Sequence, residues 1–183
     1  MKGILRNAAL CGLATMVIGG AAQAQEGRYK VNSTAVKAGL FMPSGKEARN
    51  GGGHQIFALE ADYVAQYIPE RNQTNVVSVG YIEKGALRLV PMTLNQLFHD
   101  NKGKTRYDVY YGYGIGVYSA RLSNLDNSNG SKLLLGGALT AGWNINDKSF
   151  LEAKYHLIFN YNKKDVGGLL LMYGLPLLSI DLR

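Results

Sequence analysis

Apolar side chains occupy every second position in long stretches of this chain. In Tyr107–Ala120 the odd positions carry mostly bulky apolar or aromatic residues, and the even positions carry mostly glycine, tyrosine or a polar residue. The same alternation runs through Lys132–Ile145 and Phe150–Phe159. Successive side chains of a β-strand point to opposite sides, so this period of two predicts strands with one bulky face and one small or polar face.

Breaks rich in glycine, asparagine and aspartate separate these stretches and divide the chain into eight predicted strands. The inward and outward faces of Ala86–Phe98 cannot be assigned from the sequence, because leucines stand on both faces and Pro91 has no N–H to donate to a neighbouring strand. No helix is expected between the strands. The predicted strands are Asn32–Met42, Gln55–Gln66, Asn75–Glu83, Ala86–Phe98, Tyr107–Ala120, Lys132–Ile145, Phe150–Phe159 and Val166–Leu177.

The direction in which the bulky faces point decides between a membrane barrel and a soluble one. In Phe150–Phe159 the polar residues Glu152, Lys154 and His156 stand between apolar ones. A soluble sheet would expose these three to water, whereas a small membrane barrel encloses them and turns its bulky face to lipid. The pattern favours an all-β fold: a closed, antiparallel, up-and-down transmembrane β-barrel of eight strands. A soluble periplasmic barrel that binds a ligand behind inward apolar faces is the alternative.

The first 24 residues predict a secretory signal peptide. Lys2 and Arg6 form a positive n-region, Ala8–Ile18 is a short apolar segment, and Ala22-Gln23-Ala24 offers small residues for cleavage. The apolar segment is shorter than the roughly 20 residues that a spanning helix needs, so a retained anchor is the less favoured alternative. The predicted division is a signal peptide at 1–24 and an outer-membrane barrel domain at 25–183.

Composition narrows the chemistry of the mature chain. Cys11, the one cysteine, lies in the signal peptide, which leaves no disulfide, thiol nucleophile or thiolate metal ligand. Glycine (23) and tyrosine (12) are frequent and proline is limited to four, which suits a curved sheet with aromatic girdles. The net charge of +7 becomes +5 once Lys2 and Arg6 are subtracted, and this excess is spread out. Nucleic-acid binding is therefore not expected.

A barrel of this kind keeps both chain ends and its short turns on the periplasmic side. This rule places Asn146-Asp147-Lys148 in the periplasm and makes Pro43–His54, Ser123–Ser131 and Asn160–Asp165 external loops. Gly51-Gly52-Gly53 has neither the Gly-Lys-Ser/Thr sequence nor the following helix of a phosphate-binding loop, so we expect a flexible segment there. The aromatic residues expected near the membrane interfaces are Tyr107, Trp143 and Tyr155.

Several of these segments together resemble a known protein family. They are Lys37–Gly45, Tyr111–Gly116, Gly142–Ile145 and Glu152–Tyr155, and the chain is similar to the small eight-stranded outer-membrane proteins such as outer membrane proteins W, X and the barrel of A. The resemblance implies a barrel in the cell outer membrane, with outer-membrane lipids and the barrel assembly machinery as partners. Members of that family usually end the last strand on an aromatic residue, whereas Leu177 stands there in this chain.

Charged and polar residues on the predicted inward faces form the candidate site. An eight-stranded barrel is filled by its own side chains, and enclosed charges must pair to offset their desolvation. We therefore expect Lys37 and Lys154 to contact inward carboxylates. The predicted polar network of the lumen is Lys37, Glu60, Asp62, Asp108, Glu152, Lys154 and His156.

Catalysis and metal binding have weaker support. His54 and His99 lie beside predicted loops and have no neighbours at metal-ligand spacing. His156 is not followed two residues later by a serine, as the resemblance to lipid-A deacylases of this architecture would require. We assign no catalytic residue, no metal site and no cofactor.

The expected function is a structural or passive role in the outer membrane, with narrow permeation or passage of small hydrophobic ligands as further possibilities. An enzyme that modifies envelope lipids is a second class, and the soluble ligand-binding barrel is a third. The sequence identifies neither a transported molecule nor an oligomeric state.

Overall fold

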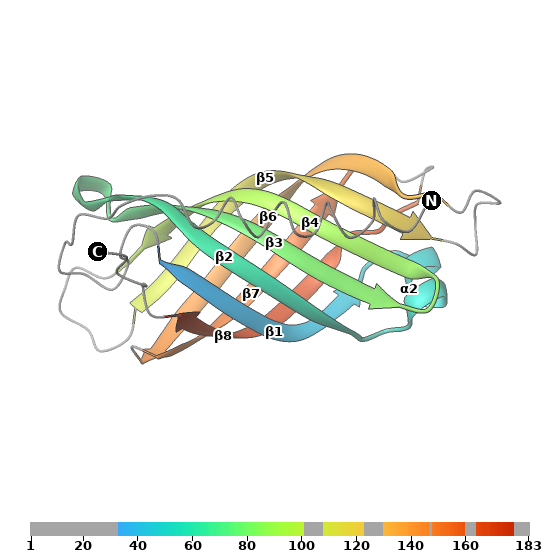
Figure 1. Cartoon of the computed structure of the whole chain (residues 1–183), viewed down its shortest axis with the longest axis horizontal. Coiled ribbons are helices and arrows are strands. Elements are labelled where there is room, and N and C mark those ends of the chain that lie inside the picture. The colour runs from blue at the N-terminus through green and yellow to red at the C-terminus, as the bar shows by residue number, and fades with distance from the viewer. Residues whose placement is uncertain (1–32, 101–107, 123–129, 147, 160–163, 178–183) are drawn as a thin grey trace, which may run out of the picture.

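The protein is described by a computed structural model covering residues 33–100, 108–122, 130–146, 148–159 and 164–177. The predicted signal peptide lies outside the described residues. Eight antiparallel strands close into one up-and-down barrel in chain order, with β8 paired to β1 (Figure 1). The strands are β1 (Thr34–Pro43), β2 (Ile56–Ile68), β3 (Gln73–Lys84), β4 (Leu87–His99), β5 (Asp108–Leu122), β6 (Lys132–Asn146), β7 (Ser149–Ile158) and β8 (Gly168–Leu177).

The strand predictions are confirmed, with each boundary within two residues of its predicted place. A barrel of eight strands has two ends. We call the end that carries the short helix α2 (Lys46–Gly52) the helix end, and the end where β1 begins and β8 finishes the terminal end. A 3₁₀ turn, η1 (Pro69–Arg71), joins β2 to β3 at the terminal end. Among the described residues, no helix has the length and apolarity needed to cross a membrane.

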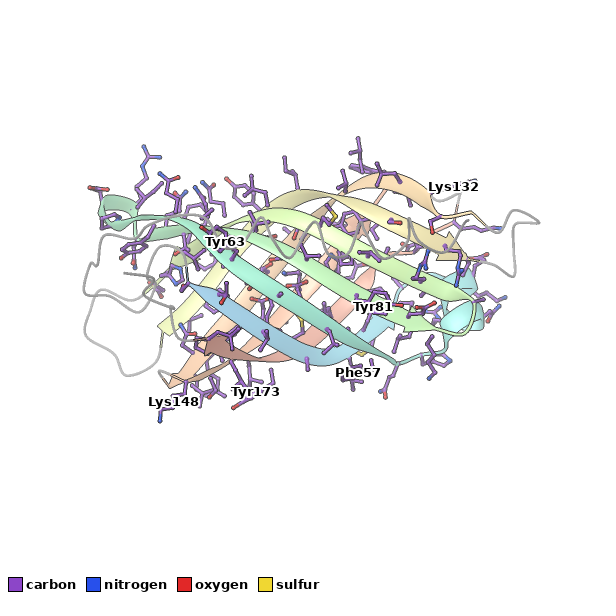
Figure 2. The ribbon with its side chains drawn as sticks, viewed as in Figure 1. Phe57, Tyr63, Tyr81, Lys132, Lys148 and Tyr173 are labelled. Carbon is purple, nitrogen blue, oxygen red and sulfur yellow. The ribbon has the colours of Figure 1, made fainter. Side chains whose placement is uncertain are left out.

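The bulky faces of the strands point away from the barrel axis, as predicted. Leu133 is 73% exposed and Ile115 is 71% exposed, although both are large apolar residues. Figure 2 shows Phe57, Tyr81 and Tyr173 projecting outward from the wall. An apolar exterior of this kind favours the membrane barrel over the soluble ligand-binding barrel, because it would be exposed to water in a soluble protein.

Glycines on the inner face make room for large side chains of the neighbouring strand. Tyr110 is paired with Gly142, where an added Cβ would lie 2.0 Å from the tyrosine ring. Phe150 is paired with Gly174 in the same way, and the added Cβ would lie 2.1 Å from its ring. The glycine-bearing faces are therefore inward because the narrow lumen has space for only one large side chain of each such pair.

The faces of β4 are settled by the structure. Leu87 and Leu89 point inward and are fully buried, so Val90, Met92 and Leu94, which opposed them in the sequence, lie on the outward face. Pro91 also lies on the inward side, and the β3–β4 ladder has no paired residues between Val79↔Met92 and Ile82↔Leu89. The missing proline N–H explains the gap.

The prediction of a flexible, helix-free segment around Gly51-Gly52-Gly53 is wrong. Residues 46–52 form α2, which sits over the barrel at the helix end with Ala48 and Gly52 buried. A Cβ on Gly52 would lie 2.6 Å from Ile56 Cδ1, and one on Gly51 would lie 2.8 Å from Leu122 Cδ1. These glycines serve close packing of the helix on the lumen, which loop-like composition cannot reveal.

Candidate functional site

Five charged side chains meet in the middle of the lumen, and we call this set the charged layer. It consists of Lys37 from β1, Glu60 and Asp62 from β2, and Glu152 and Lys154 from β7. The alternation of each strand turns these residues inward, and closure of the barrel brings β7 near β1 although 115 residues separate Lys37 from Glu152.

Lys37 is the centre of the charged layer. Its Nζ lies 2.5 Å from Glu60 Oε1, 2.8 Å from Asp62 Oδ2 and 2.8 Å from Glu152 Oε1. The residue is only 2% exposed. One ammonium group therefore serves three carboxylates and uses the three donors that a lysine has.

Lys154 on β7 completes the layer. Its Nζ pairs with Glu60 Oε1 and lies 3.5 Å from Glu152 Oε1. Tyr110 donates its hydroxyl to Glu152 Oε2 at 2.9 Å, so both oxygens of that carboxylate have partners. Two ammonium groups thus hold three carboxylates together in a setting where an unpaired charge would cost several kcal/mol, roughly, in lost hydration.

The two remaining members of the predicted network are placed differently. His156 is fully buried next to the layer, but its Nδ1 lies 3.2 Å from the hydroxyl of Tyr118, which itself donates to Gly137 O at 2.8 Å. The partner of His156 is thus a tyrosine and not a serine. Asp108 begins β5, and its side chain lies outside the part of the chain whose side chains the structure describes.

The other histidines occupy the two ends of the barrel. His99 Nε2 lies 2.9 Å from Thr74 Oγ1, and its ring packs against that of Tyr110 at the terminal end. His54 is exposed after α2. Within the described ranges, no three histidine, cysteine, aspartate or glutamate side chains are grouped so that they could hold a metal ion.

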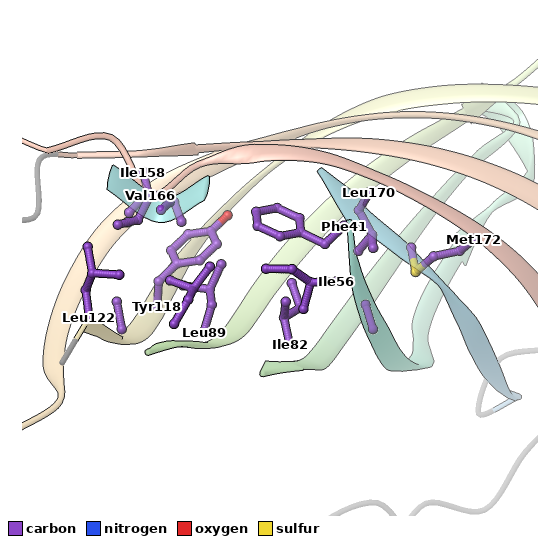
Figure 3. Close-up of a cluster of buried hydrophobic side chains, with 14 residues drawn as sticks. Phe41, Ile56, Ile82, Leu89, Tyr118, Leu122, Ile158, Val166, Leu170 and Met172 are labelled. Atoms are coloured by element: carbon purple, nitrogen blue, oxygen red, sulfur yellow. The ribbon is translucent and has the colours of Figure 1, made fainter. Parts of the chain in front are cut away.

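A large apolar cluster fills the lumen between the charged layer and α2, and we call it the mouth cluster. The alternation did not predict this cluster, because the enclosed faces were expected to be polar or small. Figure 3 shows Phe41, Ile56, Leu89 and Tyr118 converging inside the barrel. The signal was present as bulky residues on the inward positions near one end of each strand. The full set is Phe41, Ala48, Ile56, Ala58, Ile82, Leu87, Leu89, Tyr118, Ala120, Leu122, Ile158, Val166, Leu170 and Met172.

A smaller apolar group, the base cluster, closes the terminal end. It consists of Val64, Val76, Leu97, Tyr110 and Phe150. Between it and the charged layer lies a narrow cavity in which no position accepts a sphere the size of a water molecule. The lumen is therefore occupied in three tiers from one end to the other.

Comparison with solved structures identifies the fold. Neisserial surface protein A is similar over 79% of this chain and 95% of its own, with a TM-score of 0.61 and 13% identity. The N-terminal β-barrel domain of Pseudomonas aeruginosa OprF is similar over 80% of this chain and 98% of its own, with a TM-score of 0.50 and 13% identity. This chain has the fold of the small eight-stranded outer-membrane barrels. No family model matches it, and no curated protein matches it in sequence.

The fold and the exterior together are those of an outer-membrane β-barrel. The neighbours are outer-membrane barrels, and the apolar outer face supplies the band that a bilayer requires. The predicted orientation, with the terminal end in the periplasm and the helix end outward, rests on the rule that barrels of this class keep their chain ends in the periplasm.

Proposed function

We propose that the protein is a closed outer-membrane barrel with a structural role, which does not conduct ions in its resting state. The observation that carries this proposal is the filling of the lumen by the mouth cluster, the charged layer and the base cluster. In each tier, side chains from different strands contact one another, so the interior contributes to the stability of the wall.

The mouth cluster argues against passage of a small hydrophobic ligand along the axis. Tyr118 and Phe41 are fully buried there, and α2 covers them with Ala48 buried against the same cluster. A ligand could enter only by displacing these side chains together, at the cost of the contacts that bury them.

An enzymatic role finds no support in the surroundings of His156. Its ring lies between Tyr118 and Phe41 inside the barrel, away from the lipid face where an envelope lipid would be attacked. Acyl transfer also requires a nucleophile within hydrogen-bond reach of a base, and the tyrosine hydroxyl beside His156 already donates to Gly137 O.

Narrow permeation is the second candidate, and one observation favours it. The cavity below the charged layer is lined by Asp62, Asn95 and Thr140, and each of these side chains has an oxygen without a hydrogen-bond partner in the described structure. Unpartnered oxygens could exchange with water or ions if the layer rearranged, which would make the layer a barrier to a small pore.

Conductance of the reconstituted mature protein in planar lipid bilayers separates the two candidates. Heat-modifiable migration on a gel verifies that the protein recovered from the bilayer-forming lipid is folded. A general porin serves as the positive control for conductance. We expect the inserted protein to show no discrete current steps. Reproducible steps that change size in an Asp62→Asn variant would overturn the closed barrel and favour narrow permeation.

A further inference from the structure

A row of charged side chains crosses the outer wall at the helix end. Glu83 on β3 is the cross-strand partner of Arg88 on β4, and Arg88 is the partner of Arg121 on β5. All three stand at outward positions of their strands, since their sequence neighbours Ile82, Leu87 and Leu122 are buried in the mouth cluster. The row therefore belongs to the membrane-facing side of the wall.

The two arginines of this row have only one carboxylate between them. Glu83 Oε1 lies 3.2 Å from Arg121 Nη2, and Glu83 Oε2 accepts the hydroxyl of Tyr81. Arg88 Nη2 donates to the neutral hydroxyl of Ser131 at 2.7 Å. Arginine stays charged under all ordinary conditions, and like charges on directly opposite residues destabilise a sheet. The row thus carries one excess positive charge.

The described contacts also leave arginine donors unused. In the described structure Arg88 donates to Ser131 through Nη2 and Arg121 donates to Glu83 through Nη2. A guanidinium presents five N–H donors in a planar fork that matches carboxylate and phosphate oxygens, and neighbouring guanidiniums suit a phosphate best. Two guanidinium groups on adjacent strands can therefore bind an anionic group that approaches from outside.

The height of the row on the wall indicates where that group comes from. The next outward positions toward the terminal end are Tyr81 on β3, Val90 on β4 and Ser119 on β5. Beyond them the outer wall is apolar, with Leu133 73% exposed and Ile115 71% exposed. The row marks the edge of the apolar band at the helix end, where lipid tails give way to headgroups. In the predicted orientation the helix end faces outward, so these are headgroups of the outer leaflet.

We propose that Arg88 and Arg121 bind a phosphate group of an anionic glycolipid in the outer leaflet. The phosphate lies between the two guanidiniums, which supply charge-assisted hydrogen bonds, while the acyl chains of the lipid lie against the apolar wall below. Glu83 orients Arg121 through its ion pair, and Ser131 orients Arg88.

Native mass spectrometry of the folded protein in detergent tests this site with lipid A as the probe. The double variant Arg88→Gln/Arg121→Gln is compared with Arg71→Gln/Lys148→Gln, which removes the same charge from exposed residues at the terminal end. We expect lipid A binding to weaken at least about tenfold in the first variant, the ratio that one charge-assisted hydrogen bond supplies. The control variant keeps the affinity of the unmodified protein.

Further arms identify the recognised group and guard against misfolding. Arg88→Lys/Arg121→Lys keeps the charge but loses the fork, so its affinity should fall between the other two. Dephosphorylated lipid A should bind the unmodified protein as weakly as lipid A binds the glutamine variant. Heat-modifiable migration verifies the folding of each variant. Equal binding by all variants, or full competition by inorganic phosphate alone, would overturn the lipid site.

Discussion

The charged layer and the mouth cluster fill the same lumen, yet they stabilise it in different ways. The mouth cluster buries apolar side chains whose contacts add up, so each residue contributes by its own area. The charged layer contains five ionisable groups whose mutual attraction only offsets the loss of their hydration. Its members stabilise the fold when all are present, whereas a member left without its partners would destabilise it.

This difference explains why the two tiers occupy different levels. The strands that form the mouth cluster end beneath α2, which shields the apolar side chains from water at the helix end. The charged layer lies between the mouth cluster and the base cluster, and mutual pairing makes burial tolerable there. Removing one member should therefore harm the charged layer more than the loss of a comparable apolar side chain harms the mouth cluster.

The largest effect is expected for Lys37→Met. It leaves Asp62 without its ion-pair partner and leaves Glu152 with Lys154 alone at 3.5 Å. We expect the free energy of unfolding to fall by about 4 kcal/mol, measured by urea titration of protein folded in lipid vesicles. Lys148→Met, at an exposed turn, should change it by less than about 0.5 kcal/mol.

A second variant tells whether charge is the cause of that loss. Lys37→Met combined with Asp62→Asn removes the carboxylate that the first change orphans, so the double variant should be more stable than Lys37→Met alone. If the loss of stability in the double variant instead equals the sum of the losses in the two single variants, the residues act independently and no charged layer exists.

The next largest effect is expected for Leu89→Ala in the mouth cluster. Leu89 is fully buried, so the change removes buried apolar atoms and leaves a cavity whose lining loses contacts. We expect the free energy of unfolding to fall by about 3 kcal/mol in the same titration. Leu133→Ala removes the same atoms from the lipid face and should cost less, because fluid lipid tails fill the space. Equal losses would mean that the cluster is loosely packed.

The smallest effect is expected for Gly142→Ala, at the boundary between the base cluster and the charged layer. The new methyl group would meet the ring of Tyr110, whose hydroxyl holds Glu152, so the ring must shift. We expect a loss of about 2 kcal/mol, measured as a lower urea midpoint with an unchanged slope. Gly130→Ala, where nothing lies within 4 Å, provides the matched control and should be neutral.

The sequence by itself determined the strands, the faces of all of them except β4, and the class of the barrel. A period of two assigns each residue to one face without knowledge of its neighbours, and the exterior of Tyr107–Ala120 was predictable for this reason. The identities of most inward charges, such as Glu60 and Lys154, followed from the same rule. Even the places of the turns could be predicted, because glycine, asparagine and aspartate interrupt the alternation.

Only the tertiary structure decided what each inward residue touches. Closure of β8 on β1 and the stagger of the strands set the height of each side chain in the lumen, and these are properties of the whole sheet. For this reason Lys37 meets Glu152 across 115 residues, while Leu89 joins an apolar tier that the alternation of β4 alone left undecided. The helix over the mouth cluster also depended on closure, since the short glycine-rich α2 gains its stability from the surface it covers.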